Sequence, residues 1–277
     1  MACLNDLNQH SRIQKNALIG RFFIPALLTL FCLISFAKEI PRNYCVSTHF
    51  HEKVKLDYVV DGDTIVLKDK RHIRLIGINT PELSHNKKPS EQGALKAKQA
   101  LSKILKGHNS IMLRYGQVRL DRHGRTLAHL YLNDGTNVQA HLLTSGLAMP
   151  LRIPPNLSLA DCYNQSSQYA KSHDLGLWAL SRYKTHDVAN LKGHENGFYI
   201  IKGDVRQVTK SRSSVWINMD NKLSLKIKNN DLKYFDKLDL DALQGKMIQA
   251  SGWLYKHRGQ PRMRIRHKLD LTNVSKQ

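Results

Sequence analysis

The residue types best suited to chemistry gather in segment 59–82, VVDGDTIVLKDKRHIRLIGINTPE. Asp63 opens a β-branched apolar run, and a second run follows it after a polar turn. In the second run the period of two puts Arg74 on the strand face opposite Leu75. Glu82 comes just after a proline, which ends the strand. Carboxylates and an arginine at strand ends and in loops indicate a phosphate or metal site.

These side chains need a β-rich scaffold to hold them. Residues 54–178 are predicted to form three strands, a helix, two strands and two more helices, which is the order of an OB-fold barrel. Residues 179–195 are polar and predicted to be a linker, and residues 196–272 repeat the same order more faintly. The expected fold class is therefore mainly β with helices, as one five-stranded barrel and a second OB-like barrel.

The expected elements can be bounded by turn and cap residues. In the first half they are strands at 54–60, 64–67, 71–78, 111–114 and 127–132, helices at 91–106, 136–146 and 158–176, and a loop at 115–126. In the second half they are strands at 197–208, 214–219, 222–228, 245–255 and 262–267, with a helix at 231–243. Ser90 is the predicted cap of the first helix.

The chain is strongly basic. Its 277 residues contain 43 Lys and Arg against 22 Asp and Glu, a formal net charge of +21. Such an excess indicates a polyanionic partner, either nucleic acid or an anionic membrane surface, but it does not define a reaction.

The first 37 residues are typical of a targeting segment. Arg12, Lys15 and Arg21 precede an apolar run, and Ser35-Phe36-Ala37 offers a small-x-small cleavage site. We expect a cleaved signal peptide and an exported protein, periplasmic or secreted. The alternative is an uncleaved anchor in the membrane, since the polar region before the apolar run is long. Removing 1–37 lowers the net charge only to +19, so the basicity belongs to the folded part.

Two cysteines remain after residue 37, Cys45 and Cys162. In an oxidising compartment an even pair is expected to form a disulfide, and the alternative is two buried thiols. The histidines show no metal-ligand spacing, so no zinc site is expected.

An ordered set of motifs carries a family resemblance. Asp61-Gly62-Asp63-Thr64, Arg74-Leu75, Thr80-Pro81-Glu82 and Asp121-Arg122-His123-Gly124-Arg125 occur where a known family carries them, and Gly146-Leu147-Ala148 and Gly176-Leu177-Trp178 also match. Residues 54–178 thus resemble the staphylococcal nuclease (thermonuclease) family of phosphodiesterases. The resemblance covers a little under half of the chain.

The resemblance implies roles for individual residues. Arg74 and Arg125 match the two arginines that clamp the scissile phosphate, and Glu82 matches the general base that activates water. Asp63 matches a carboxylate ligand of Ca²⁺, and Thr80 matches the residue whose backbone carbonyl binds that metal. The implied activity is a sugar-nonspecific endonuclease, acting on DNA and RNA, that leaves 3′-phosphate ends.

Physical chemistry supports these roles. Attack on a phosphodiester adds negative charge to the nonbridging oxygens, and a fixed guanidinium stabilises that charge. A hard cation with oxygen ligands suits the same oxygens. The alternative function is a non-catalytic nucleic-acid-binding protein on the same fold, but binding alone does not require a glutamate beside a phosphate.

Two departures from the family pattern matter. Asn79 stands where the calcium-dependent family member has an aspartate, so the predicted metal set of Asp63, Asn79 and Thr80 has one carboxylate fewer and should bind Ca²⁺ more weakly. His123 and Arg152 replace tyrosines near the substrate, which leaves the preferred nucleotide end open.

The second half carries a basic ribbon at 262–266 with Tyr255 and Trp253 as possible stacking faces. We expect this ribbon to add nucleic-acid contacts. The alternative for Trp253 is a position in the core of the second half. No stable protein partner is expected.

Overall fold

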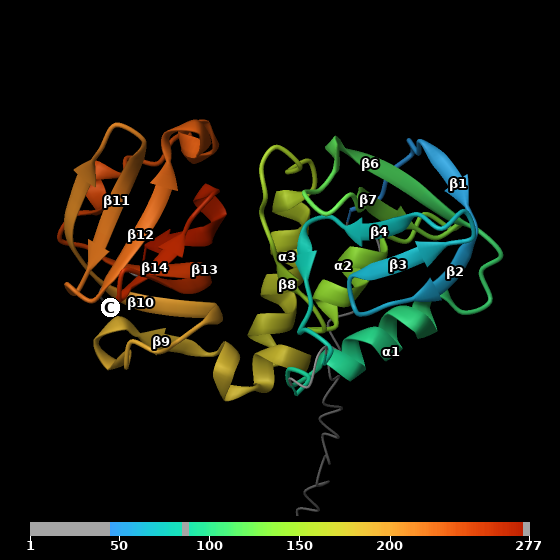
Figure 1. Ribbon diagram of the computed structural model, residues 1–277, viewed down its shortest axis with the longest axis horizontal. Coiled ribbons are helices and arrows are strands. Elements are labelled where there is room, and N and C mark those ends of the chain that lie inside the picture. The colour runs from blue at the N-terminus through green and yellow to red at the C-terminus, as the bar shows by residue number, and fades with distance from the viewer. Residues whose placement is uncertain (1–44, 85–88, 274–277) are drawn as a thin grey trace, which may run out of the picture. The chain divides into compact units, whose positions relative to one another are not determined.

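Two β-sheets and three α-helices form most of the structure (Figure 1). The computed structural model describes residues 45–84 and 89–273, which belong to the unit Glu39–Gln277. The expected signal peptide or anchor at 1–37 lies outside these residues. No helix in the described ranges has both the length and the apolar character needed to cross a bilayer.

The first sheet holds six strands in the order β1-β6-β7-β4-β3-β2. Their bounds are β1 Glu52–Val54, β2 Leu56–Val59, β3 Thr64–Leu67, β4 His72–Leu75, β6 Ile111–Leu120 and β7 Thr126–Tyr131. Neighbours pair antiparallel except β4 and β7, which are parallel. Ile73 and Leu75 are buried and Arg74 is partly exposed, so the predicted alternation is confirmed.

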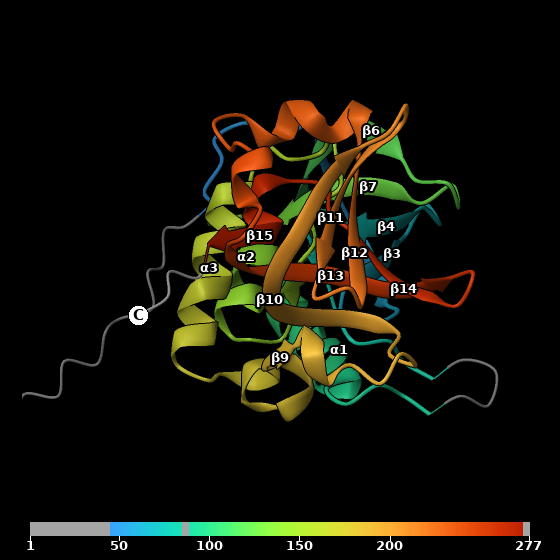
Figure 2. The ribbon, with the colours of Figure 1, turned by 90° about the vertical axis from the view of Figure 1, so that its left-hand side faces the viewer.

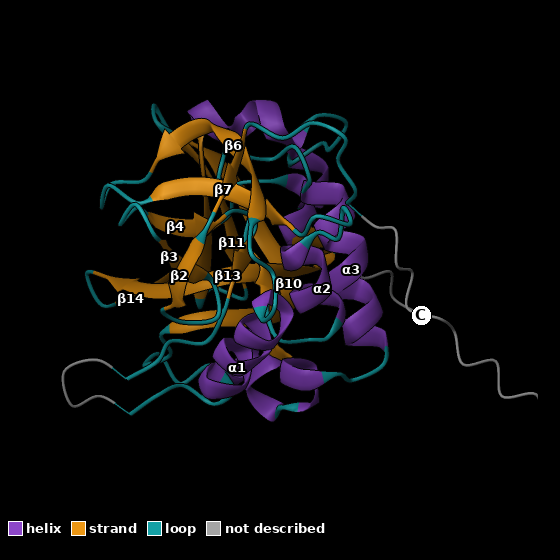
Figure 3. Ribbon diagram, turned by 90° about the vertical axis from the view of Figure 1, so that its right-hand side faces the viewer, coloured by secondary structure: helices purple, strands orange, loops and turns teal. Residues whose placement is uncertain are grey.

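The three helices cover one side of this sheet (Figure 3). They are α1 Ala94–Leu105, α2 Val138–Thr144 and α3 Ala160–Ser172. The apolar stripe of α1 packs into the core through Ala97, Leu101 and Leu105. The prediction that Ser90 caps α1 is wrong, because the N-cap is Gly93 and it makes no side-chain cap bond.

A two-stranded sheet joins the end of the chemical segment to a later loop. In it β5 (Ile78–Asn79) pairs antiparallel with β8 (Met149–Pro150), and Asn79 lies opposite Met149. The strand expected at 71–78 is therefore two strands that belong to different sheets.

The second sheet is a closed ring of five strands with two additions. Its strands are β9 Thr185–Asp187, β10 Gly197–Lys210, β11 Ser214–Met219, β12 Leu223–Lys228, β13 Met247–His257, β14 Gln260–Arg264 and β15 Leu271–Asn273. β10 pairs with both β11 and β13, which closes the ring β10-β11-β12-β14-β13 around its own core (Figure 2). This is the OB-like strand order, and β2-β3-β4-β7-β6 of the first sheet follow the same order.

Two expected elements are wrong. The helix expected at 231–243 is replaced by 3₁₀ segments at Asn229–Phe235 and Asp241–Leu243. The loop expected from residue 115 is strand as far as Leu120, because Leu120 still pairs with Thr126 of β7 after an irregularity in the register and the Asn156 side chain bonds to the backbone of Val118.

Segment 179–195, expected to be a linker, contains short elements. Tyr183 and Val188 are buried, and β9 pairs parallel with β10. A third core cluster joins Tyr183 and Trp178 to Phe198 of β10. The domain boundaries themselves stay a prediction.

A disulfide links Cys45 to Cys162 of α3 across 117 residues of sequence. Of the two alternatives left open by the sequence, the structure has the disulfide.

Candidate active site

A buried carboxylate organises the turn that precedes β3. Asp63 is 5% exposed, and its Oδ2 accepts hydrogen bonds from the backbone N–H of Thr80 at 2.9 Å and from its hydroxyl at 3.2 Å. The Thr64 hydroxyl donates to Asp63 Oδ1 at 3.1 Å. These bonds fasten the turn before β3 to the end of β5.

Gly62 permits this close approach. A Cβ at Gly62 would lie 2.7 Å from the Thr80 hydroxyl and 2.7 Å from the Cβ of Ala97 on α1. Because real side chains do not approach so closely, only glycine fits between the two aspartates of the motif.

Arg74 of β4 reaches the same carboxylate. Its Nη2 lies 3.0 Å from Asp63 Oδ2 and 3.0 Å from Asn79 Oδ1. Its Nη1 donates to the backbone carbonyls of Leu75 at 2.7 Å and Ile78 at 2.9 Å. The guanidinium is thus held by four acceptors, which fixes its orientation.

Asn79 connects this arginine to Thr80. Asn79 is 7% exposed, and while its Oδ1 accepts from Arg74, its Nδ2 donates to the Thr80 carbonyl at 2.9 Å. The structure therefore brings Asp63, Arg74, Asn79 and Thr80 into one hydrogen-bonded cluster.

Arg125 is positioned by the turn between β6 and β7. Asp121 Oδ1 accepts from the backbone N–H groups of His123 at 2.8 Å and Arg125 at 2.9 Å, and its Oδ2 lies 2.8 Å from Arg125 Nε. Burial alone would raise the pKa of Asp121, but these bonds and the Arg125 charge bring it below its ordinary value. Asp121 therefore stays ionised and orients Arg125.

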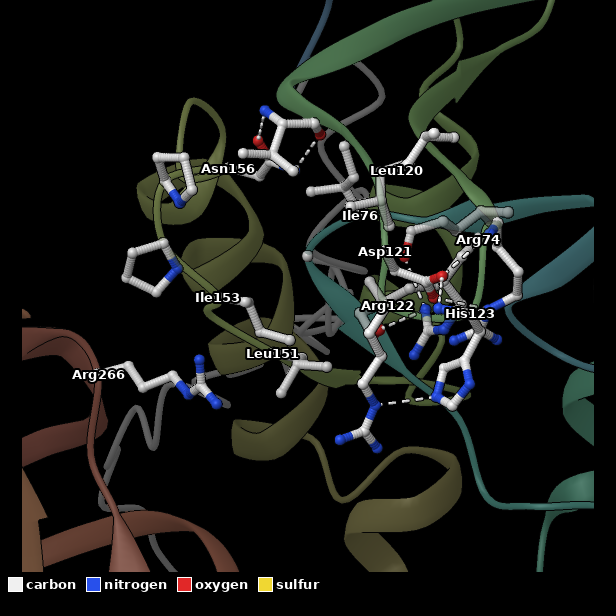
Figure 4. A pocket seen from close by; sticks show the side chains of 18 residues that line it. Arg74, Ile76, Leu120, Asp121, Arg122, His123, Leu151, Ile153, Asn156 and Arg266 are labelled. Atoms are coloured by element: carbon white, nitrogen blue, oxygen red, sulfur yellow. Dashed lines mark hydrogen bonds and ion pairs between the residues drawn. The ribbon is translucent and has the colours of Figure 1, made fainter.

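Arg74 and Arg125 line one cavity of about 500 Å³ (Figure 4). Its apolar wall includes Val118, Leu120 and Ile153, which remain 44%, 56% and 46% exposed. Positive charge beside uncovered apolar surface suits a ligand with both a phosphate and a flat apolar group.

Glu82 is exposed and lies in the loop after Pro81. Partial burial of its carboxyl group and the charges of Asp63 and Asp61 raise its pKa, while Arg74 opposes the rise. Burial and Asp61 also raise the pKa of Asp63, against the effect of Arg74. Glu82 thus lies within electrostatic reach of the cluster, although it is not among the residues that line the cavity.

The donor set fits a hard cation. Carboxylate, amide and backbone carbonyl oxygens are what Ca²⁺ prefers. Burial, and to a lesser degree neighbouring carboxylates, raises the pKa of both Asp63 and Glu82, and a bound cation would favour their ionised forms. No cluster of three His, Cys, Asp or Glu with metal-binding geometry occurs among the described residues.

Several site features were not predicted from the sequence. The role of Asp121 could have been read from its spacing to Arg125, since an aspartate that opens a turn commonly accepts from the following backbone N–H groups. Arg266 also lines the cavity, and only the folded chain brings it there. Arg152 is not among the residues that line this cavity, because its guanidinium binds Asp270 at 2.7 Å.

The fold and this cluster define an OB-like protein with an arginine- and carboxylate-bearing site at the ends of strands β3, β4 and β7. The chain matches the family model of staphylococcal nuclease homologues over residues 72–180. It is 34% identical over 125 residues to Thermonuclease of Staphylococcus intermedius, covering 43% of this chain and 72% of that protein. The chain belongs to the staphylococcal nuclease family.

Two further relatives come from Bacillus subtilis (strain 168). Endonuclease YncB is 34% identical over 141 residues, covering 48% of this chain and 64% of the relative. The SPbeta prophage-derived endonuclease YokF is 34% identical over 140 residues, covering 48% of this chain and 46% of the relative. The chain thus spans less than two thirds of either of these two proteins.

Proposed function

We propose that this chain is an exported endonuclease that hydrolyses phosphodiester bonds in DNA and RNA. The observation that carries the proposal is the pair of guanidinium groups, Arg74 and Arg125, that line one cavity beside the buried carboxylate of Asp63. Relatives named endonuclease and thermonuclease support the same activity.

The two arginines bind the scissile phosphate. Each is oriented by a carboxylate, Arg74 by Asp63 and Arg125 by Asp121, so little reorganisation is needed as charge grows on the nonbridging oxygens. Each such donor is typically worth about 3 kcal/mol of barrier. The exposed apolar side chains of the cavity wall pack against a base.

Glu82 removes the proton of the attacking water. The water oxygen forms a bond to phosphorus while the bond to the 5′ oxygen breaks, and the leaving oxygen takes a proton from solvent. The products are a 3′-phosphate end and a 5′-hydroxyl end. General-base assistance of this kind is typically worth ~10²–10⁴-fold in rate.

Asp63, Asn79 and the Thr80 carbonyl are the residues that would hold Ca²⁺. When bound, the ion supplies positive charge to the phosphate oxygens and to the water. Asn79 gives the site less negative charge than an aspartate would, so we expect a weaker divalent site.

Export is supported by the apolar, basic-flanked segment 1–37 and by the Cys45–Cys162 disulfide, which is typical of an oxidising compartment. Retention through an uncleaved anchor is the alternative, and cell fractionation with the mass of the mature protein distinguishes the two.

The decisive test is digestion of plasmid DNA and of single-stranded RNA, with Ca²⁺ and with chelator. Glu82→Gln and Arg74→Ala are each expected to reduce cleavage by at least ~100-fold. Arg212→Ala serves as the control, since Arg212 is exposed and lines none of the cavities described for this chain. A phosphatase-sensitive 3′ end is expected on the products.

Persistent cleavage in both variants would show that the site is elsewhere. Binding of nucleic acid without any cleavage by the unaltered chain would instead support a non-catalytic binding protein.

A further inference from the structure

Arg266 belongs to the second β-region, which holds β9 to β15, but it lines the cavity of the candidate active site in the first β-region, which holds β1 to β8. It follows β14 and lines the cavity of about 500 Å³ together with Arg74 and Arg125. In Figure 4 Arg266 lies across from Arg122 and His123, with Leu151 and Ile153 between them. The cavity is therefore built by both β-regions of the chain.

The guanidinium of Arg266 is incompletely neutralised. Its neighbour Arg264 lies 2.8 Å from Asp231, and Arg152 lies 2.7 Å from Asp270. For Arg266, no side-chain hydrogen bond or ion pair occurs with the residues that the structure describes. Burial and the charge of Arg264 lower its pKa, against Asp231 and Asp270. A partly dehydrated cation in such a place gains from an anionic ligand.

Asp270 fixes the position of Arg266. One carboxylate oxygen of Asp270 accepts from the backbone N–H groups of Arg266 at 3.4 Å and His267 at 3.2 Å, and the other binds Arg152 at 2.7 Å. The Arg152 side chain is only 4% exposed, and its sequence neighbours Leu151 and Ile153 form the cavity wall. The wall and the Arg266 backbone are thus held by one carboxylate.

The cavity continues past Arg266. A second cavity of about 200 Å³ shares Leu151, Ile153 and Arg266 with the first and extends to Trp253 and Arg264. Trp253 is 38% exposed and packs edge-on against Phe198 at 5.6 Å between ring centroids. A base can stack on its uncovered face.

On the other side, a cavity of about 420 Å³ shares His123 and Arg125 with the first and is lined by Lys70 and His72. These three cavities form a basic track that extends in both directions from Arg74 and Arg125. An extended single strand of nucleic acid requires such an arrangement.

We propose that Arg266 binds a backbone phosphate of a nucleotide next to the scissile phosphate, so that the second β-region forms part of the substrate groove. The inference rests on the proposed function in taking nucleic acid as the ligand. It assigns to the C-terminal region a share in binding a single strand several nucleotides long.

The test measures binding separately from cleavage. A fluorescent single-stranded DNA of roughly 12 nucleotides, the span of one to two OB-fold sites, is titrated with the full chain in chelator, and anisotropy gives Kd. Arg266→Ala is expected to weaken binding about tenfold, the loss of one charge-assisted hydrogen bond. The slope of log Kd against log salt should fall by about 0.7.

Arg212→Ala is the matched control, because it removes the same charge from an exposed site outside the cavities that form this track. Arg266→Gln removes the charge but keeps a polar side chain with two of the three methylene groups, and it should lose affinity in the same way if Arg266→Ala fails to fold. Folding of each variant is checked by its circular dichroism and melting temperature. An Arg266 variant that is folded and binds as tightly as Arg212→Ala would overturn the proposal.

Failure of the two proposals can be told apart. A chain that shows the expected Arg266 effect on Kd but cleaves nothing contradicts only the nuclease. A chain that cleaves normally, with KM for the long strand unaffected by Arg266→Ala, contradicts only the role of Arg266. A loss in KM that grows from a dinucleotide to the longer strand supports both.

Discussion

At the scale of single residues, Asn79 is the most informative position of the site. Its amide does two things at once: the oxygen accepts from Arg74, and the nitrogen donates to the Thr80 carbonyl. A carboxylate at this position could accept from Arg74 but could not donate to the carbonyl. The asparagine therefore strengthens the internal hydrogen bonding of the cluster at the expense of negative charge toward a cation.

Asn79→Asp is expected to tighten Ca²⁺ binding by at least about tenfold, since a carboxylate replaces an amide and the Thr80 carbonyl loses a competing donor. Isothermal titration calorimetry with Ca²⁺ alone measures this without a nuclease assay. Asn133→Asp adds the same charge in an exposed turn and should leave the affinity unchanged. Equal Ca²⁺ affinity in Asn79→Asp and the unaltered chain would contradict this account.

Asp121→Asn tests how Arg125 is oriented. The substitution removes the charge that holds the guanidinium at 2.8 Å, so we expect kcat to fall about tenfold with a smaller change in KM. Asp134→Asn is the control, because Asp134 accepts from the backbone of Thr136 in another turn. In an Arg125→Ala background, Asp121→Asn should have no further effect, and additive losses would mean that the two residues act independently.

At the scale of elements, the sequence predicts strands well where one face is buried. The alternation of Ile73 and Leu75 with Arg74, and the bounds of β11 at Ser214–Met219, follow from side chains that must reach a core. The extension of β6 to Leu120 was missed because residues 117–120 are exposed and carry no core pattern. Within this part only Leu120 pairs with β7, opposite Thr126, while the backbone N–H and carbonyl of Val118 bond to the Asn156 side chain. Side-chain periodicity does not reveal such contacts.

The candidate site likewise contains residues that the sequence predicts and residues that it does not. The motif residues from Asp63 to Glu82 are close in sequence, and a local pattern suffices to predict them. The contact between Arg152 and Asp270 joins positions 118 residues apart, and Arg266 reaches the cavity only through that packing. Such contacts depend on how β14 and the loop after β8 meet, which no short motif encodes.

The contact between β7 and α3 contains a titratable group. His129 is 1% exposed, and its Nδ1 lies 2.9 Å from the hydroxyl of Tyr163 on α3. Burial, with the charge of Arg114 beside it, lowers the pKa of His129 from 6.5 to about 3. Between these two pH values the unfolded chain binds a proton that the folded chain does not, so stability falls as the pH drops below 6.5.

We expect His129 to cost about 2 kcal/mol of folding free energy at pH 5 relative to pH 7. His129→Gln cannot titrate, so its difference in free energy of unfolding between these pH values should be smaller by that amount. Urea unfolding followed by circular dichroism at both pH values gives the numbers. His257→Gln, at an exposed position, should keep the difference of the unaltered chain, and an undiminished difference in His129→Gln would contradict the assignment.

At the scale of the whole molecule, the Cys45–Cys162 disulfide fastens the chain ahead of β1 to α3. Cys45 is 7% exposed and belongs to the core cluster that includes Leu101 and Tyr163. The disulfide therefore closes a loop that contains β1 to β8 and every residue of the candidate site except Arg266.

Because that loop spans 117 residues, its removal should destabilise the chain by up to about 4–5 kcal/mol through the entropy of the unfolded state. Cys45→Ser with Cys162→Ser should lower the urea midpoint, and a reductant should lower that of the unaltered chain to a similar value. When produced with residues 1–37, the double variant retains Cys3 and Cys32, and insensitivity of its midpoint to reductant then shows that these two cysteines do not contribute. The contrary result is an unaltered chain whose urea midpoint is the same with and without reductant, although labelling shows that its thiols are reduced. That result would mean that the disulfide does not stabilise the fold and that the packing of α3 is sufficient.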